Sequence, residues 1–261
     1  SLAEIGPHLT GTWRQVEWHA EIDSTQTRAR ALAREGAAQG TTVIAETQTA
    51  GRGRLGRAWH SPAGMNLYCS VVLRPAMAPA AVPQLALVVG LAVVDAVRAT
   101  TDLPVRIKWP NDVVLADRKV AGVLMEMEAE VDRVHYAIAG IGVNVNLPLD
   151  AFPAELRDRA TSLAAACGHP VDRAVFTARL LAELEARYSQ YCARGLSAMR
   201  ADWEACSSLT DRTVTVAGPD GARTGRVLGI DDDGALRLEV AGQPERVVVG
   251  EVTLAAGGYG R

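Results

Sequence analysis

Apolar residues along this chain alternate with polar ones or form short continuous runs, and these patterns predict most of its secondary structure. Strands are expected at residues 41–46 and 65–73, followed by a closely linked block at 105–109, 112–116, 119–128 and 133–145. Links of only a few residues separate the members of this block, so consecutive strands should pair as antiparallel hairpins. This segment of the chain is therefore predicted to build one largely antiparallel sheet.

Three other segments have helical patterns. Ser24 is a candidate N-cap for a helix that runs to Arg34 and stops at Gly36. Residues 83–99 are apolar almost all round, which predicts a buried helix. Asp172 can cap a third helix, whose apolar residues recur at helical spacing and are interpreted as core: Phe176, Leu180, Leu184, Tyr188 and Tyr191.

The pattern changes near Leu209. Short β-type segments at 212–216, 224–230, 235–240 and 246–254 are separated by turn sequences rich in Gly, Asp and Pro. Four or five strands in about 50 residues are typical of a small barrel. We therefore predict an α+β protein with a larger domain over residues 1–208 and a small β-domain over residues 209–261. The tail at residues 257–260 is expected to be mobile.

Composition excludes several classes of protein. With 261 residues the chain can bury a substantial core, and its net charge of −3 argues against general affinity for nucleic acid. The apolar run at 85–94 is too short to span a membrane, and no signal peptide is visible at the start. The four cysteines and five histidines lack the spacing of metal ligands, so no structural metal is predicted. Reduced thiols are the simplest account of the cysteines, which favours a cytoplasmic protein.

One segment concentrates charge and backbone freedom. Between Gln48 and Trp59, three glycines (Gly51, Gly53, Gly56) alternate with three arginines (Arg52, Arg54, Arg57). The glycines match a dinucleotide-binding pattern, but neither the apolar helix nor the acidic residue of that fold follows. Forked guanidinium groups suit carboxylate or phosphate oxygens, and glycines let the backbone approach and rearrange around an anion. A solvated basic hairpin tip is the alternative for this segment alone.

Two later motifs favour an anion site. Residues 108–112 place an ammonium, an amide and a carboxylate at a bend fixed by proline, and Lys119 follows. Residues 140–146 end an apolar strand in glycine and amide residues. Together with residues 23–25 and the arginine segment, these motifs resemble the biotin protein ligase family in order and over nearly the whole chain.

The resemblance implies a fold and a domain count. Family members have a central mixed, largely antiparallel sheet flanked by helices, similar to class II aminoacyl-tRNA synthetases, and a C-terminal SH3-like β-barrel. Some members also carry an N-terminal helix-turn-helix and repress transcription. Only about 20 residues precede Asp23 here, too few for that module, so a monofunctional enzyme without nucleic-acid or membrane partners is expected.

The resemblance also implies a reaction in two steps. Biotin and ATP, with Mg²⁺, give biotinyl-5′-AMP and pyrophosphate, and a lysine of a biotin carboxyl carrier domain then attacks the mixed anhydride. A carboxylate is a poor electrophile, so the first step needs cations that neutralise the reacting oxygens. The oligomeric state expected is a monomer or a weak homodimer.

Site residues are assigned by position in the motifs. Biotin contacts are expected from Ser24, Thr25, Gln48, Gly51, Arg52, Gly53, Arg54, Lys119 and Gly122. Contacts with ATP or the adenylate are expected from Arg52, Arg54, Arg57, Trp59, Asn111, Lys119 and Asn144. Arg52, Lys119 and Asp112 are the candidate catalytic residues, with Asp112 placed to hold Mg²⁺ with the phosphates or to orient the incoming amine.

Structural roles compete for four of these residues. Ser24 can cap its helix, Lys119 can be an edge lysine, Trp59 can pack over a strand and Asp112 can stabilise a turn. Two other functions also remain open. A lipoate or octanoate transferase would share the fold, although residues 108–112 and the terminal β-module favour biotin. A non-enzymatic nucleotide or nucleic-acid binder would bind ATP or DNA without releasing pyrophosphate.

Overall fold

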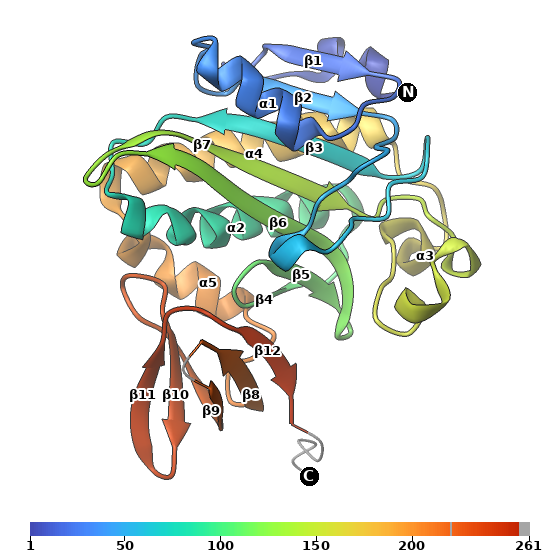
Figure 1. The fold of residues 1–261 in the computed structure, drawn as a ribbon. Coiled ribbons are helices and arrows are strands. Elements are labelled where there is room, and N and C mark those ends of the chain that lie inside the picture. The colour runs from blue at the N-terminus through green and yellow to red at the C-terminus, as the bar shows by residue number, and fades with distance from the viewer. Residues whose placement is uncertain (220, 256–261) are drawn as a thin grey trace.

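A seven-stranded mixed sheet forms the centre of the molecule, for which a computed structural model describes residues 1–219 and 221–255 (Figure 1). The strand order is β1-β2-β3-β7-β6-β5-β4. The strands are β1 (Val16–His19), β2 (Thr42–Ala45), β3 (Leu67–Leu73), β4 (Arg106–Lys108), β5 (Asp112–Leu115), β6 (Arg118–Ala129) and β7 (Val134–Val143). Only β1 and β2 pair in parallel, and every other neighbouring pair in this sheet is antiparallel. The short links predicted this pairing for β4, β5, β6 and β7.

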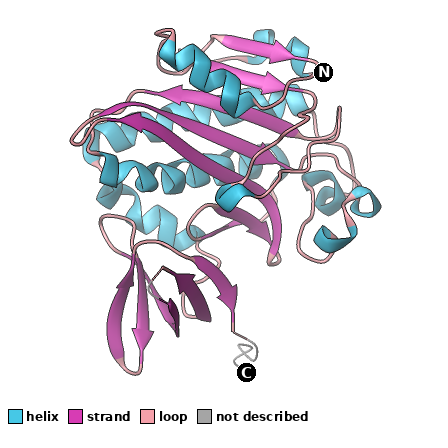
Figure 2. Cartoon of the chain, in the orientation of Figure 1, coloured by secondary structure: helices cyan, strands magenta, loops and turns pink. Residues whose placement is uncertain are grey.

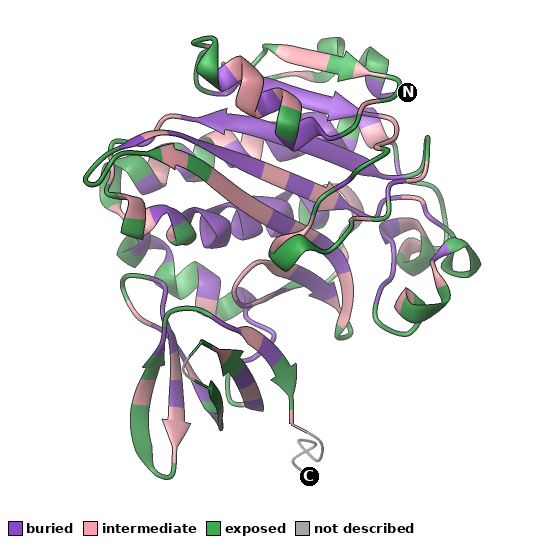
Figure 3. Cartoon of the chain, viewed as in Figure 1, coloured by how far each residue is buried: buried purple, intermediate pink, exposed green. Residues whose placement is uncertain are grey.

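Helices cover both faces of this sheet. Helix α1 (Thr25–Arg34) packs on one face, where Ala29 and Ala33 meet Val43 and Val72. On the other face lie α2 (Val82–Thr101) and α4 (Arg173–Arg194), seen behind the sheet in Figure 1. Because successive residues of a strand point to opposite faces, strands covered on both sides bury every residue, as β2 and β3 do (Figure 3).

The predicted helices are present, with details that the sequence did not settle. Ser24 stands at the N-cap of α1, but its side chain makes no capping hydrogen bond. Asp172 does cap α4, by accepting hydrogen bonds from the backbone N–H groups of Ala174 and Val175. The segment Pro79–Thr101 is long and apolar enough to cross a membrane, and 72% of its most apolar window is buried inside the protein. Burial of that extent is what a core helix shows.

A second sheet of five antiparallel strands follows the short helices α3 (Leu163–Cys167) and α5 (Arg200–Cys206) (Figure 2). Its strands run in the order β11-β10-β9-β8-β12. They are β8 (Thr213–Gly218), β9 (Gly221–Ile230), β10 (Leu236–Val240), β11 (Gln243–Val247) and β12 (Glu251–Leu254). The single strand predicted at 246–254 was wrong, because residues 248–250 separate β11 from β12 and the two strands lie at opposite edges.

The remaining differences are small. Strand β1 was not predicted, since none of its four residues is fully buried and two of them are the polar Glu17 and His19. Short 3-10 turns also lie outside the prediction: Leu2–Glu4, Gly6–His8, Arg54–Gly56, Pro79–Ala81, Leu149–Ala151, Ala154–Leu156 and Leu196–Met199. The predicted mobility of residues 257–260 concerns positions outside the described residues.

The two sheets share one core and several polar contacts. Buried residues from both belong to one contiguous apolar cluster. The buried indole of Trp109 donates its Nε1–H to the carbonyl of Gly234 at 3.0 Å. Arg212 pairs with Asp117 at 2.7 Å. The second sheet therefore packs against the end of the first sheet that carries β4 and β5.

Candidate active site

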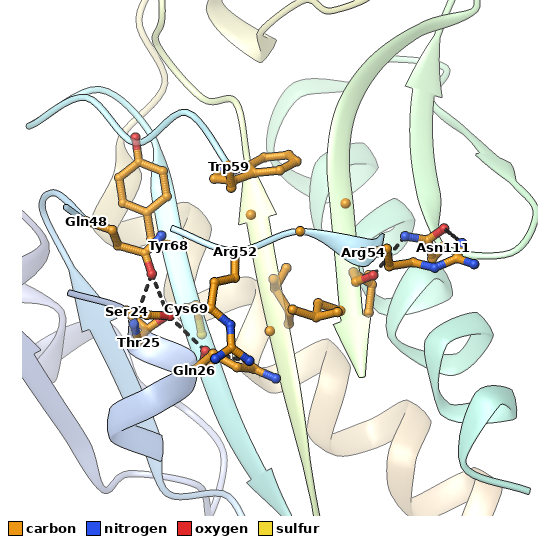
Figure 4. Close-up of a pocket in the computed structure, with 18 of the residues that line it drawn as sticks. Ser24, Thr25, Gln26, Gln48, Arg52, Arg54, Trp59, Tyr68, Cys69 and Asn111 are labelled. Carbon is orange, nitrogen blue, oxygen red and sulfur yellow. Dashed lines mark hydrogen bonds between the residues drawn. The ribbon is translucent and has the colours of Figure 1, made fainter. Parts of the chain in front are cut away.

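A pocket of about 470 Å³, part of it open to solvent, lies over β3, β6 and β7 beneath the arginine segment. Figure 4 shows its labelled side chains in two groups, with Arg52 between them. Gln48, Ser24, Thr25 and Gln26 gather at one end, whereas Arg54 and Asn111 lie at the other. We call these the neutral end and the charged end, and we count Arg52 with the charged end. The chain therefore brings the start of α1, the arginine segment and the proline bend, distant in sequence, to one hollow.

Hydrogen bonds fix the side chains of the neutral end. Thr25 donates its backbone N–H to Oε1 of Gln48 at 2.9 Å, and its hydroxyl lies 2.9 Å from that of Ser70. Ser70 donates to Oε1 of Gln26 at 3.0 Å. The hydroxyl oxygen of Ser24 is buried and has no partner among the described residues. Since Ser24 does not cap its helix either, its hydroxyl is available to a ligand.

Ion pairs and polar contacts define the charged end. Lys119 places Nζ 2.7 Å from Oδ1 of Asp112, the residue that opens β5. Arg54 donates to Oδ1 of Asn111 at 2.6 Å. Arg52 pairs with the carboxylate of Glu126 on β6. The cations of this site are therefore held by the oxygens of the protein itself, as a ligand anion would hold them.

The indole of Trp59 lies on two glycines. A Cβ at Gly142 would come within 2.4 Å of the indole, and one at Gly122 within 3.1 Å. Nζ of Lys119 lies 5.3 Å from the ring centroid, within the range of a cation–π contact. In this structure Trp59 therefore packs over the strands, which was the structural alternative for this residue. Gly122 and Gly142 make room for that ring, which a side chain at either position would push away.

Ten of the predicted site residues line the pocket: Ser24, Thr25, Gln48, Arg52, Gly53, Arg54, Trp59, Asn111, Lys119 and Gly122. Asp112 lies beside it through the ion pair to Lys119. Three predicted residues are elsewhere. Gly51 packs behind the loop, where a Cβ would come within 2.6 Å of the Ser61 hydroxyl. Arg57 reaches out to Glu251 of β12. The amide of Asn144 donates to the carbonyl of Thr161 at 3.1 Å and is buried.

The roles predicted for those three residues stay predictions, but the contacts suggest different ones. Asn144 ties two backbone segments together, and Arg57 ties the loop to the second sheet. No role was predicted from the sequence for eight other lining residues: Gln26, Tyr68, Cys69, Ser70, Val123, Leu124, Gly140 and Ile141. Gly140 and Gly142 belonged to a motif that was noticed. The others sit on buried strands or in a helix, where a single sequence gives no sign of a pocket.

The buried thiol and phenol of the pocket are neutral. Burial raises the pKa of the Cys69 thiol to about 12. Burial also raises the pKa of Tyr68, whose hydroxyl donates to the carbonyl of Pro62 at 2.9 Å. Neither group is a nucleophile at neutral pH, because the thiolate and the phenolate are the reactive forms.

A divalent cation fits one position. No cluster of three or more potential metal ligands exists in the part of the chain that the structure describes. Mg²⁺ usually keeps water and binds through one or two carboxylates together with substrate phosphates. Asp112 supplies one such carboxylate beside the charged end. A magnesium ion held by Asp112 would therefore need the phosphates of a bound nucleotide for its other ligands.

A polar pocket joined to a cluster of cations defines a site for an acid that is activated with a nucleotide, and sequence comparison gives the family. The model of the biotin/lipoate A/B protein ligase family matches residues 18–144, and that of the biotin protein ligase C-terminal domain matches residues 210–254. The chain belongs to the biotin protein ligase family.

Relatives agree over most of their length. The chain is 40% identical over 233 residues to a bifunctional ligase/repressor of Bacillus spizizenii. The aligned region covers 89% of this chain and 72% of the relative. It is 37% identical to a biotin–[acetyl-CoA-carboxylase] ligase of Mycobacterium tuberculosis, over 92% of this chain and 89% of the relative. The structure of an Aquifex aeolicus biotin protein ligase in complex with biotin and ATP matches with a TM-score of 0.81 and 32% identity, covering 92% and 98% of the two chains.

Proposed function

We propose that this protein joins biotin to a lysine of a carrier protein at the expense of ATP. The observation that carries the proposal is the joining of two chemistries in one pocket. A buried neutral end offers hydroxyl and amide groups, and a charged end offers Lys119, Arg52 and Arg54. Such a pocket suits a neutral polar ring that carries a carboxylate on a tail. The relatives named for biotin ligation support the same substrate.

The first step forms a mixed anhydride. A carboxylate oxygen of biotin attacks the α-phosphorus of ATP, the bond to the β-phosphate oxygen breaks, and pyrophosphate leaves. Lys119, Arg52 and Arg54 lower the repulsion between the two anions and stabilise the charge on the phosphorus oxygens. Mg²⁺, held by Asp112 with the phosphates, would neutralise further charge. The arginines must release their present partners, Glu126 and Asn111, if they bind these oxygens directly.

The second step consumes the anhydride. The amine of an acceptor lysine attacks the carbonyl carbon, the bond to the phosphate oxygen breaks, and AMP leaves as the amine loses a proton. We propose that the acceptor is a biotin carboxyl carrier domain. Closure of the arginine segment over the pocket would keep water from the anhydride until the carrier arrives.

Several finer assignments belong to the same proposal. We assign the first sheet to the class II aminoacyl-tRNA synthetase-like fold, the second to an SH3-like barrel, and the domain boundary to residues 208 and 209. We further propose that the enzyme is active as a monomer or weak homodimer in the cytoplasm. Four free cysteines fit that location, since reduced thiols are typical of it.

A pyrophosphate-exchange assay tests the activity directly. We expect labelled pyrophosphate to enter ATP only when biotin is present, and lipoate to support at least about 100-fold slower exchange, since unpaired buried acceptors at the neutral end reject a ring without N–H groups. Exchange with lipoate as fast as with biotin would identify a lipoate enzyme instead. ATP binding without any exchange would identify a nucleotide binder.

A further inference from the structure

The neutral end of the pocket is held between two backbone carbonyls. One belongs to Ile138 in the middle of β7 and the other to Trp59 on the arginine segment. A carbonyl oxygen can only accept hydrogen bonds, so each one determines which atom of a neighbouring polar group faces it. The direction of every hydrogen bond between the two carbonyls follows from these fixed points.

The chain of hydrogen bonds from Ile138 runs through Gln26. Nε2 of Gln26 donates to the Ile138 carbonyl at 3.3 Å, which turns Oε1 toward Ser70. Oε1 then accepts the hydroxyl proton of Ser70 at 3.0 Å. Gly140 allows this arrangement, because a Cβ there would lie 2.4 Å from Oε1 of Gln26. Both Gln26 and Ser70 are buried, so water does not compete for these bonds.

The chain of hydrogen bonds from Trp59 runs through Ser61. The Ser61 hydroxyl donates to the Trp59 carbonyl at 2.9 Å and therefore presents a lone pair to Gln48. Nε2 of Gln48 donates to that lone pair at 3.1 Å. Oε1 of Gln48 then faces Thr25, from which it accepts the backbone N–H at 2.9 Å and the hydroxyl at 3.2 Å.

In these two chains of hydrogen bonds, the hydroxyl protons of Thr25 and Ser70 are already donated to protein groups. The Ser70 proton is on the bond to Gln26, so Thr25 directs its proton to Ser70 or to Gln48. The side-chain oxygens at this end therefore offer lone pairs and no proton to a ligand. Ser24 is the exception among the described residues here, with a buried hydroxyl that is free to donate. Several acceptors and one donor complement a cyclic urea, which has two N–H groups and one carbonyl.

We propose that Gln26 is a positioning residue that sets the specificity of this site for a ring that donates hydrogen bonds. It acts through Ser70: by holding the Ser70 proton, Gln26 keeps the hydroxyl oxygen an acceptor. The inference rests on the proposed function, because it deepens the account of how the biotin ring is selected. A purely structural role is the competing explanation, since Gln26 also joins α1 to β7.

The test compares two substrates in the pyrophosphate-exchange assay. One is biotin, and the other is its cyclic carbamate analogue, in which an oxygen replaces one ring N–H. Wild type should prefer biotin by about thirtyfold in KM, because a ring oxygen facing a fixed acceptor leaves both unpaired. Gln26→Met keeps the linear shape of the side chain without its polar atoms. Freed from Gln26, the Ser70 hydroxyl can rotate and donate to the ring oxygen, so the preference should fall to about threefold.

Controls separate specificity from folding. Gln15→Met removes another amide oxygen that accepts from a threonine hydroxyl, that of Thr41, outside the pocket, and should keep the wild-type preference. Ser70→Ala removes the group through which Gln26 acts. In that background, Gln26→Met should cause no further change in the preference, a non-additivity that marks coupled residues.

The outcomes are distinct. If wild type shows no exchange with biotin, the proposed function itself fails. If wild type is active and Gln26→Met raises both KM values equally, Gln26 only supports the fold and the inference is overturned. An unchanged KM for both substrates also overturns it. A loss of preference that persists at full size in the Ser70→Ala background would show that Gln26 does not act through Ser70.

Discussion

The two ends of the pocket contrast in how their polar groups are held. At the neutral end, buried side chains from α1 and β3 bond to one another and to the backbone carbonyl of Ile138 in β7. At the charged end, half-exposed side chains pair with carboxylates and an amide that a ligand can displace. One end is fixed before any ligand arrives, whereas the other is held in place by substitutes for the ligand.

The difference follows from the free energy of burying polar groups. Leaving a buried hydroxyl or amide without a partner costs free energy, so the hydrogen bonds of the neutral end hold most of its side chains in place. Exposed ion pairs contribute little stability and are readily exchanged. We infer that the neutral end selects the ring and that the charged end performs the chemistry. Changes at the first should then alter KM, and changes at the second should alter kcat.

The largest effect is expected at Lys119. Lys119→Ala removes a charge from the reacting centre, and the adenylation rate should fall by about 100-fold or more while the protein remains folded. Single-turnover formation of biotinyl-adenylate measures this rate. Arg14→Ala is the control, because Arg14 is an exposed cation that does not line the pocket. A rate for Lys119→Ala within about twofold of wild type would remove this residue from the chemistry.

A smaller effect with the opposite kinetic signature is expected at Ser61. Ser61→Ala removes the acceptor of the Gln48 amide and frees that side chain to turn. The KM for biotin should rise by about tenfold, the cost of one lost buried hydrogen bond, with kcat nearly unchanged. Ser189→Ala on the exposed face of α4 serves as the control. A fall in kcat without a change in KM would break the division of labour between the two ends.

The same contrast explains which parts could be predicted from sequence. The strands and helices that build the sheet follow from apolar periodicity, because both faces of the sheet are buried. Strand β1 was not predicted, since none of its four residues is fully buried and they show no such pattern. The charged end was also accessible to prediction, because Arg52, Arg54 and Lys119 lie in glycine-rich or hairpin segments where a core role is implausible.

Only some residues of the neutral end could be predicted, because the others lie in regular structure where a core role is expected. Ser24, Thr25 and Gln48 were predicted from their motifs, but Gln26 and Ser70 were not. Ser70 lies in a strand in which every residue is buried, and Gln26 lies in the first turn of a helix. Their partners, Ile138 and Gly140, are about 110 residues or more from Gln26 along the chain, and periodicity carries no information about such contacts.

Limited digestion with trypsin sharpens the contrast in order between the two ends. The arginine segment contains Leu55, which is 71% exposed and has a positive φ of 56° that a leucine rarely adopts. Cleavage after Arg52, Arg54 or Arg57 should be fast without ligand and at least about fivefold slower with biotin and ATP together. Cleavage after Arg28 of α1 should be slow in both conditions. Equal cleavage of the segment in both conditions would show that ligands do not close it.

The smallest effect is expected from salt, and it discriminates between the two ends without any mutation. At the charged end, Arg52 is 40% exposed and its contacts with anions are open to screening. Raising KCl from about 0.05 to about 0.5 M shortens the Debye length severalfold and should raise the KM for ATP by about threefold.

Biotin methyl ester is the probe for the neutral end in the same titration, because it keeps the ring but lacks the carboxylate. Its inhibition constant against biotin should change by less than about 1.5-fold, since buried hydrogen bonds between neutral groups are not screened by ions. If salt weakened binding of the ester as much as it weakened binding of ATP, binding of the ring would depend on the arginines as well. The neutral end would then not be an independent recognition element, and Arg52 would belong to both ends of the pocket.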